Sequence, residues 1–298
     1  MTLTTSTAAA SAQPSRLATG LTRRKATNWV MLSLLVLTLG IAIVPLLAIL
    51  AYVLVRGIPG LNGALFTQLP KPVLKGAGGM QNSMVGSLII VALGSVIGAL
   101  IGLAGGIYLA EYGRGRFAAA VRLFSDVLAG VPSITIGLFA YVLLVVPLHS
   151  FNAIAAAVAL AIIMLPLVVR TTEQILRLVP PSLREAGLGL GVPHWKVILR
   201  VLLPASAGGI ATGMLLAVAR IAGETAPLLF TAFGNEFAQY SLLKPIDALP
   251  LRLFKYASGP YASWHKLAQA SALVLIAFVL AISAVARWLA RRSFVAGR

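Results

Sequence analysis

Two charged residues lie in a stretch of the chain that otherwise carries no charge. Arg220 and Glu224 are four residues apart within residues 205–230, so on a helix they would share one face. A guanidinium presents a planar fork of donors that fits an oxyanion, and a carboxylate accepts a hydrogen bond from a protonated oxyanion. Because a charge at membrane depth is costly, the pair indicates an oxyanion path, with a purely structural ion pair as the alternative.

The polar segment before Pro204 predicts a helical hairpin. Ser182 and Glu185 have the spacing of a capping box, which would start a short helix. Gly191 suits a left-handed cap at the end of that helix, and Pro193 suits the first turn of a second one. Pro204 is expected to end the second helix. A short helix between hinges suits the transmission of motion from a partner, although a simple capping role for Glu185 is the alternative.

Both sets of residues need a frame of membrane-spanning helices. Hydrophobic residues make up 59% of the chain, charged residues 10%, and the mean hydropathy is +0.95. A soluble domain carries about 25% charged residues, whereas a spanning helix needs about 20 apolar ones. Six stretches qualify as helices in lipid: residues 29–55, 84–109, 127–148, 153–169, 205–230 and 267–286. The expected fold class is an all-α integral membrane protein with six transmembrane helices.

Basic residues are distributed unequally between the two sides of these helices. With the N-terminus inside, 16 of the 24 Lys and Arg residues fall in inner segments, seven in outer segments and one, Arg220, in a span. Positive residues gather on the cytoplasmic side, so both termini and the hairpin are expected in the cytoplasm. The same rule explains the net charge of +17 without a nucleic-acid partner.

The sequence lacks the residue sets of common catalytic and metal sites. It has no cysteine, its three histidines lie in different loops, and no nucleophile motif suggests hydrolysis. It also lacks the Gly-x-x-x-x-Gly-Lys-Ser/Thr loop that holds nucleotide phosphates. The chain is therefore expected to have no catalytic residue, metal ligand or cofactor of its own, and any ATP would be bound by another chain.

Four glycines recur at every fourth position of the second apolar stretch: Gly94, Gly98, Gly102 and Gly106. Small residues at this spacing let another helix approach closely. Packing within the chain is favoured over a dimer interface, because a chain with several spans has many internal partners. Apolar residues at helical spacing over residues 117–128 then predict an amphipathic helix at the inner membrane surface, broken before the third span by Gly130 and Pro132.

The hairpin resembles the EAA loop of ABC-importer permeases. That loop has Glu-Ala-Ala, a glycine six residues after the glutamate, and a final hydrophobic-x-Leu-Pro. The matching residues here are Glu185-Ala186-Gly187, Gly191 and Val201-Leu202-Leu203-Pro204. In that family the loop is where the membrane subunit grips its ATPase. The resemblance implies a type I (MetI-like) permease fold and ATPase coupling through Arg184, Glu185, Ala186, Gly187 and Gly191.

Residues 128–139, 170–173 and 219–228 resemble the permeases of phosphate importers, and residues 248–254 resemble their A-type subunit more than its C-type partner. The resemblance implies an inner-membrane subunit that forms half of a path for inorganic phosphate, lined by Arg220, Glu224, Thr225 and Arg170. It implies a heterodimer with a C-type permease subunit. It also implies two ATPase subunits that bind ATP and an extracytoplasmic phosphate-binding protein.

These features divide the chain into segments. Residues 1–27 are expected to be a disordered cytoplasmic tail, 28–55 the first transmembrane helix, 56–83 an irregular periplasmic loop, 84–290 a permease core with the hairpin at 170–204, and 291–298 a basic cytoplasmic tail. Two other functions stay open. An ABC permease for another oxyanion or small solute would keep the hairpin, whereas a secondary transporter would have no use for it.

Overall fold

The structure of the chain is a computed structural model that describes residues 15–72 and 78–295. Within these ranges every regular element is a helix, apart from one isolated bridge between Phe233 and Ile246. The chain divides into two compact units, Met1–Tyr52 and Val53–Arg298, which are described separately. The expected all-α fold class is confirmed.

Helix α1 (Ser15–Gly57) supplies the first candidate span. Its side chains over residues 29–55 are mostly exposed, which suits a surface in contact with lipid. Because α1 already begins at Ser15, the expectation of disorder over residues 1–27 is wrong for residues 15–27, and residues 1–14 lie outside the described residues. Ala, Leu, Arg and Lys are good helix formers, and an existing helix extends easily into a segment rich in them.

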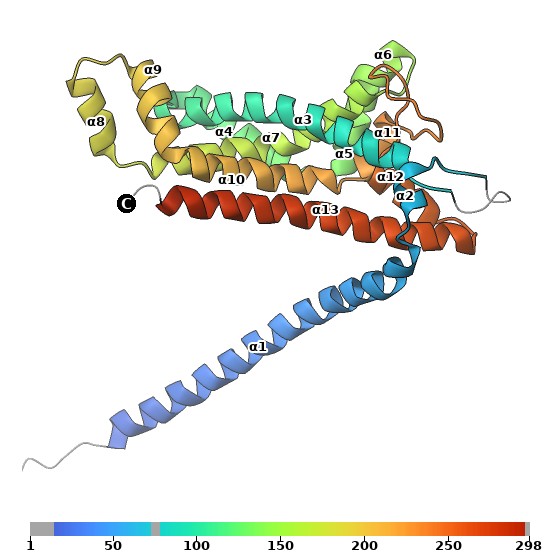
Figure 1. Ribbon diagram of the computed structural model, residues 1–298. Helices are drawn as coiled ribbons and strands as arrows, with labels where there is room; N and C mark the ends of the chain where they lie inside the picture. Colours follow the sequence, from blue (N-terminus) through green and yellow to red (C-terminus); the bar gives the residue numbers. More distant parts are fainter. Residues whose placement is uncertain (1–14, 73–77, 296–298) are drawn as a thin grey trace, which may run out of the picture. The chain divides into compact units, whose positions relative to one another are not determined.

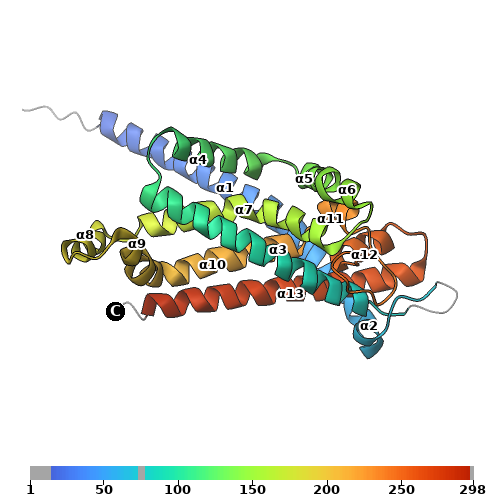
Figure 2. The ribbon, with the colours of Figure 1, turned by 90° about the horizontal axis from the view of Figure 1, so that it is seen from above.

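Four long helices run side by side in the second unit (Figures 1 and 2): α3 (Gln81–Ile107), α7 (Ala153–Arg177), α10 (Leu203–Ala222) and α13 (Ala262–Val295). Most side chains of α7 are buried, and both α3 and α10 pack against it. α7 is therefore the centre of the bundle.

The two ends of this bundle carry different short elements. The hairpin helices α8 (Pro181–Gly189) and α9 (His194–Val197) lie at one end, called the hairpin end below (Figure 1). The short helices at the opposite end include α2 (Gly63–Thr67), α11 (Ala226–Thr231) and α12 (Leu249–Ala257). The loop at residues 56–83 is thus not wholly irregular, because it contains α2 and the 3₁₀ turn η1 (Ile58–Gly60).

The glycine stripe of α3 faces α7. A Cβ at Gly94 would lie 2.9 Å from the Ala157 carbonyl oxygen, and one at Gly102 would lie 2.7 Å from the Val168 Cβ. These separations leave no room for a side chain. The prediction that the stripe packs within the chain is confirmed.

The third span is broken rather than continuous. α4 (Gly115–Gly130) is followed by α5 (Ser133–Ala140), the π-helical turn η4 (Tyr141–Val145) and α6 (Val146–Leu148). The two parts are bent by 105°. The expected start of this span at residue 127 is wrong, because the break predicted at Gly130 and Pro132 separates it from α4. Among the described residues, five helices could each cross a membrane, and the bent pair makes six if it is one span.

Candidate functional site

Arg220 and Glu224 line one small pocket but do not share a helix. α10 ends with Gly223 as its C-cap, and Glu224 lies in the turn before α11. The expectation of one continuous helix over residues 205–230, with both charges on one face, is therefore wrong. Glycine is a poor helix former, and Pro227 cannot donate the backbone hydrogen bond that would continue the helix.

The pocket has a volume of about 120 Å³ and borders α10, α7 and the bend between α4 and α5. Arg220 comes from the last turn of α10, where the helix dipole favours a cation. The remaining lining residues are Leu128, Ala129, Val131, Ser133, Ile136 and Ile163. A cation and a carboxylate therefore face the same cavity.

Five of the seven acidic residues of the chain form ion pairs: Glu111, Asp126, Glu173, Glu236 and Asp247. Within the described ranges, Glu185 and Glu224 form none, so the expected pair of Glu224 with Arg220 is not present in this structure. The two acidic residues that the sequence selects for function are thus the two without a cationic partner among the described residues.

The other two predicted path residues lie in different surroundings. Thr225 is half-buried in the turn beside Glu224 and is the N-cap of α11, although its side chain makes no capping hydrogen bond. Arg170 is half-buried on α7 and forms an ion pair with Asp126 of α4. It is not among the residues that line the Arg220 pocket.

The hairpin has the expected outline with a different start. α8 begins at Pro181, and its N-cap, Pro180, makes no side-chain capping bond. The capping box of Ser182 and Glu185 is therefore wrong, because proline, with its fixed φ, takes the first helical position. Gly191 has a φ of +73°, and its N–H donates to the Leu188 carbonyl at 2.9 Å. The prediction of a left-handed cap at Gly191 is confirmed.

The second hairpin helix continues into the bundle. α9 begins after Pro193, as expected, and passes through the π-helical turn η5 (Ile198–Leu202) into α10. Pro204 therefore does not end this helix, and that expectation is wrong. The Leu203 N–H bonds to the Ile198 carbonyl five residues back. A π turn of this kind accommodates a residue that cannot join the usual hydrogen-bond ladder.

The hairpin residues divide into an outward and an inward set. Glu185 and Ala186 are exposed, together with apolar side chains of which Leu190 is 83% exposed. Gly187 faces inward, since a Cβ there would lie 2.9 Å from a methyl group of Val197. The glycine that departs from the EAA pattern thus lets the two hairpin helices pack closely.

Arg184 is also turned toward the bundle. Its Nη2 lies 2.8 Å from Glu111 Oε1 and 2.6 Å from the Leu176 carbonyl oxygen, and its Nη1 lies 2.8 Å from the Val179 carbonyl oxygen. The Glu111 side chain is only 3% exposed. Glu111 was not among the residues that the sequence predicted for function. Its available signal was rarity, because the whole chain has only seven acidic residues and Glu111 lies on the side rich in arginine.

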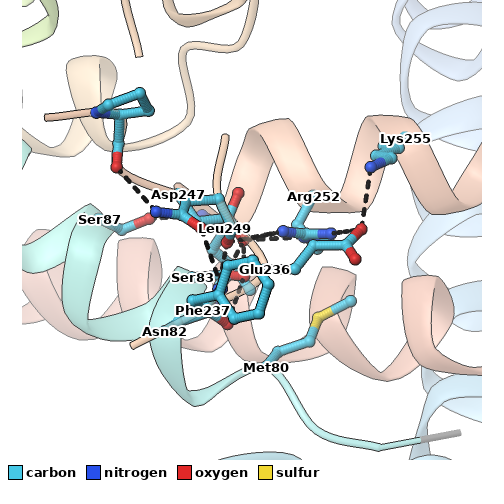
Figure 3. A network of polar contacts seen from close by, with 12 residues as sticks. Met80, Asn82, Ser83, Ser87, Glu236, Phe237, Asp247, Leu249, Arg252 and Lys255 are labelled. Atoms are coloured by element: carbon cyan, nitrogen blue, oxygen red, sulfur yellow. Dashed lines mark hydrogen bonds and ion pairs between the residues drawn. The ribbon is translucent and has the colours of Figure 1, made fainter. Parts of the chain in front are cut away.

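A buried polar network at the opposite end was also missed (Figure 3). Asp247 and Arg252 are each 2% exposed and 2.8 Å apart, and Asp247 accepts a hydrogen bond from Ser83 of α3. The Leu249 N–H at the start of α12 donates to Ser87 at 2.6 Å. Burial raises the pKa of Asp247, and Arg252 opposes that change. The network fixes α12 to the first turns of α3.

Glu236 extends this network to the surface. It accepts hydrogen bonds from Arg252 at 3.0 Å and from Lys255 at 3.1 Å. The hydrogen bond from Lys255 lowers the pKa of Glu236. Glu236 and Arg252 also line a pocket of about 530 Å³ with Phe233 and Phe237.

A bundle of apolar helices with a broken span and a helical hairpin at one end is the architecture of a membrane permease. Residues 102–294 match the family described as "Binding-protein-dependent transport system inner membrane component". The chain is 49% identical to the phosphate transport system permease protein PstA of Xylella fastidiosa (strain 9a5c), over 80% of this chain and 83% of that protein. It is 46% identical to PstA of Haemophilus influenzae, over 89% and 94% of the two chains. The chain therefore belongs to the family of inner-membrane permeases that includes these PstA proteins.

Solved structures support the same fold. The inward-facing MetNI methionine ABC transporter has a chain with a TM-score of 0.59 at 20% identity, covering 74% of this chain and 95% of that one. A chain of an amino acid ABC transporter with histidines gives a TM-score of 0.54 at 19% identity, and the match covers 70% of this chain and 92% of that one. The expected MetI-like permease fold is confirmed.

Proposed function

We propose that the chain is the permease subunit of an ATP-driven importer of inorganic phosphate and forms half of its translocation path. The observation that supports this most strongly is the identity of 42–49% to phosphate permeases over most of the chain. In this proposal the chain catalyses no covalent chemistry and binds no cofactor. ATP is bound and hydrolysed by two ATPase subunits, and a C-type permease subunit supplies the other half of the path.

Phosphate passes the Arg220 pocket in this proposal. The guanidinium of Arg220 binds phosphate oxygens, and Glu224 accepts a hydrogen bond from the protonated form of the anion. The absence of an ion pair between these two side chains leaves both available to substrate. Thr225 beside the pocket and Arg170 nearer the hairpin end are the further polar groups of the path.

The exposed hairpin surface docks the ATPase in this proposal. Glu185 and Ala186 offer a polar patch, and exposed Leu190 offers an apolar one. Gly191 ends α8, while Arg184 and Gly187 hold the hairpin in shape from inside. Both termini and the hairpin lie in the cytoplasm, and an extracytoplasmic binding protein delivers phosphate to the opposite end.

Reconstitution of the chain with its native partner subunits in vesicles tests the proposal. Uptake of labelled phosphate is expected only with ATP, the ATPase subunits and the binding protein together. Sulfate at equal concentration is expected to compete weakly, since it cannot donate a hydrogen bond to Glu224 at neutral pH. Uptake of sulfate in place of phosphate would indicate the permease of another oxyanion. Uptake without any ATPase would indicate a secondary transporter and overturn the proposal.

A further inference from the structure

The hairpin end of α3 carries a π-helical turn whose contacts the proposed function leaves unexplained. This turn, η3 (Tyr108–Tyr112), continues α3 beyond Ile107. Isolated π turns are rare in helices and are found frequently at functional positions. The turn brings Glu111, with its buried side chain, to the base of the hairpin.

Glu111 contacts both helices of the hairpin. Arg184 of α8 donates from Nη2 to Oε1 at 2.8 Å, and from Nε to both carboxylate oxygens at 3.1 and 3.2 Å. His194, at the start of α9, has its Nε2 3.5 Å from Oε2. The His194 ring also packs edge-on against Tyr112, with 5.0 Å between centroids. A single carboxylate at the end of α3 therefore contacts side chains from both α8 and α9.

The same turn is held from another side by Arg122 of α4. Its Nη2 donates to the carbonyl oxygens of Leu109 at 3.1 Å and Gly113 at 3.3 Å. Its Nε donates to Glu173 of α7 at 2.8 Å. Arg122 thus binds backbone oxygens within the π turn and just beyond it, at a helix end where carbonyl groups commonly lack helical partners. Among the described residues, η3 contacts α4 through Arg122 and the hairpin through Glu111. α7 also contacts both arginine side chains, Arg122 through Glu173 and Arg184 through the Leu176 carbonyl oxygen.

α4 continues from Arg122 to the substrate pocket. Leu128 and Ala129, near its C-terminus, are part of the pocket wall beside Arg220 and Glu224. A displacement of α4 along or about its axis must therefore alter the pocket. The hairpin, η3, α4 and the pocket wall form a continuous series of contacts.

We propose that η3 is the junction through which the hairpin moves α4, with Glu111 and Arg122 as positioning residues. Multidentate bonds between guanidinium and carboxylate or carbonyl groups are strong and directional, so they transmit rotation as well as translation. The hairpin and α4 then move as one body, and movement imposed by the ATPase reaches the Arg220 pocket. This inference rests on the proposed function of the hairpin and the pocket.

The ratio of phosphate transported to ATP hydrolysed tests the junction in the reconstituted complex. Glu111→Gln and Arg122→Gln are each expected to lower this ratio about fivefold or more, the usual scale of coupling between sites. The double variant is expected to be no worse than the worse single variant, because both act on one junction. A merely structural role would lower the yield of complex and leave the ratio of the assembled fraction unchanged.

Arg116→Gln is the matched control, since Arg116 is exposed in the same segment and makes no ion pair among the described residues. The ratio of phosphate transported to ATP hydrolysed by this variant is expected to equal that of the unaltered protein. An unchanged ratio for Glu111→Gln, or an equal loss in the control, overturns the inference. A wild-type complex that transports no phosphate would instead overturn the proposed function, so the two failures are distinguishable.

A distance measurement does not depend on the variants being active. Because the chain has no cysteine, spin labels can be placed at Ser182→Cys on α8 and Ala120→Cys on α4, both exposed positions. With Glu111 intact, the distance between the labels is expected to stay the same with and without ATP. In the Glu111→Gln variant, the distribution of distances between the two labels is expected to broaden. A distance that changes when ATP binds to the unaltered complex would show that α4 and the hairpin move separately.

Discussion

Gly106 of α3 lies directly against Thr172 of α7, where a Cβ at residue 106 would be only 2.5 Å from the Cβ of Thr172. The same relationship recurs two turns earlier between Gly98 and Met164, at 3.3 Å from the Met164 Cβ. Lipid gives helices no hydrophobic reason to associate, so close van der Waals packing of this kind holds them together. The contact of α3 with α7 therefore depends on the absence of side chains along one face.

Gly106→Ala is expected to destabilise the protein by about 1–3 kcal/mol, the usual range for an overpacked site. Thermal unfolding of the purified protein in detergent measures this. Gly40→Ala is the matched control, because Gly40 lies within α1 with nothing within 4 Å of an added Cβ. That change is expected to be neutral or stabilising by up to about 1 kcal/mol, since alanine is the better helix former. A lower melting temperature for Gly40→Ala alone would contradict the packing argument.

Asp247→Asn is expected to destabilise the opposite end of the bundle by about 3 kcal/mol, because the buried Arg252 loses its buried carboxylate partner and keeps only the exposed Glu236. Limited proteolysis within residues 231–266 is expected to become faster, since α12 loses its attachment to α3. Glu236→Gln is the control. Its side chain is 53% exposed, so the effect is expected to stay within about 1 kcal/mol. Equal effects of the two substitutions would show that burial does not decide the strength of the pair.

The stabilising effect of Glu236 is expected to depend on pH. Its pKa is lowered in the folded protein by the hydrogen bond from Lys255. A carboxylate with a lowered folded pKa adds stability above its unfolded pKa and loses it as the pH falls through the folded value. The difference in melting temperature between the unaltered protein and Glu236→Gln is therefore expected to be largest at neutral pH. It should disappear when the pH falls well below 4.5, the ordinary pKa of a glutamate. A difference that grows in acid would contradict a lowered pKa for Glu236.

Gly191→Val is expected to weaken association with the ATPase. A β-branched residue at a φ of +73° is strained by about 1–2 kcal/mol, so the end of α8 should change its path. Gly191→Asn is the matched variant, because asparagine tolerates the left-handed region and an added Cβ meets nothing within 4 Å. The amount of ATPase that co-purifies is expected to fall with the Gly191→Val variant and to stay unchanged with the Gly191→Asn variant. Equal retention of the ATPase by both variants would exclude a role for this cap in docking.

Arg220→Lys is expected to reduce phosphate uptake about tenfold or more in complexes that still assemble, because lysine keeps the charge but loses the bidentate fork. Arg220→Gln with Glu224→Gln removes both charges and is expected to assemble without transporting phosphate. Uptake of labelled phosphate per assembled complex is the measurement. Near-normal uptake by the double variant would mean that the two charges serve stability alone.

The sequence predicted those features that depend on local spacing. Apolar stretches of sufficient length located the spans, and the four-residue repeat located the face of α3 that meets α7. Gly191 was recognised because few residues other than glycine accept a left-handed cap. These features follow from neighbours along the chain, which a single sequence displays.

The features that were missed depend on partners far apart in the sequence. Glu111 and Arg184 are separated by 73 residues, and Ser83 and Asp247 by 164. The periodicity of either segment does not reveal such pairs. The wrong expectations have another source, since the capping box and the continuous fifth span both ignored the effect of a proline. Pro181 displaced the start of α8, and Pro227 with Gly223 ended α10 before Glu224.

The glycine face of α3 also has a consequence for biosynthesis. About 45 residues separate the end of α3 from the start of α7, so at about 5–20 residues per second α3 is synthesised some 2–9 s before its partner. During that interval only lipid tails or the insertion machinery can pack against the glycine face of α3. Crosslinkers placed at Gly98 in arrested nascent chains should therefore capture lipid or insertase while α7 is absent, and α7 itself once residue 177 has emerged.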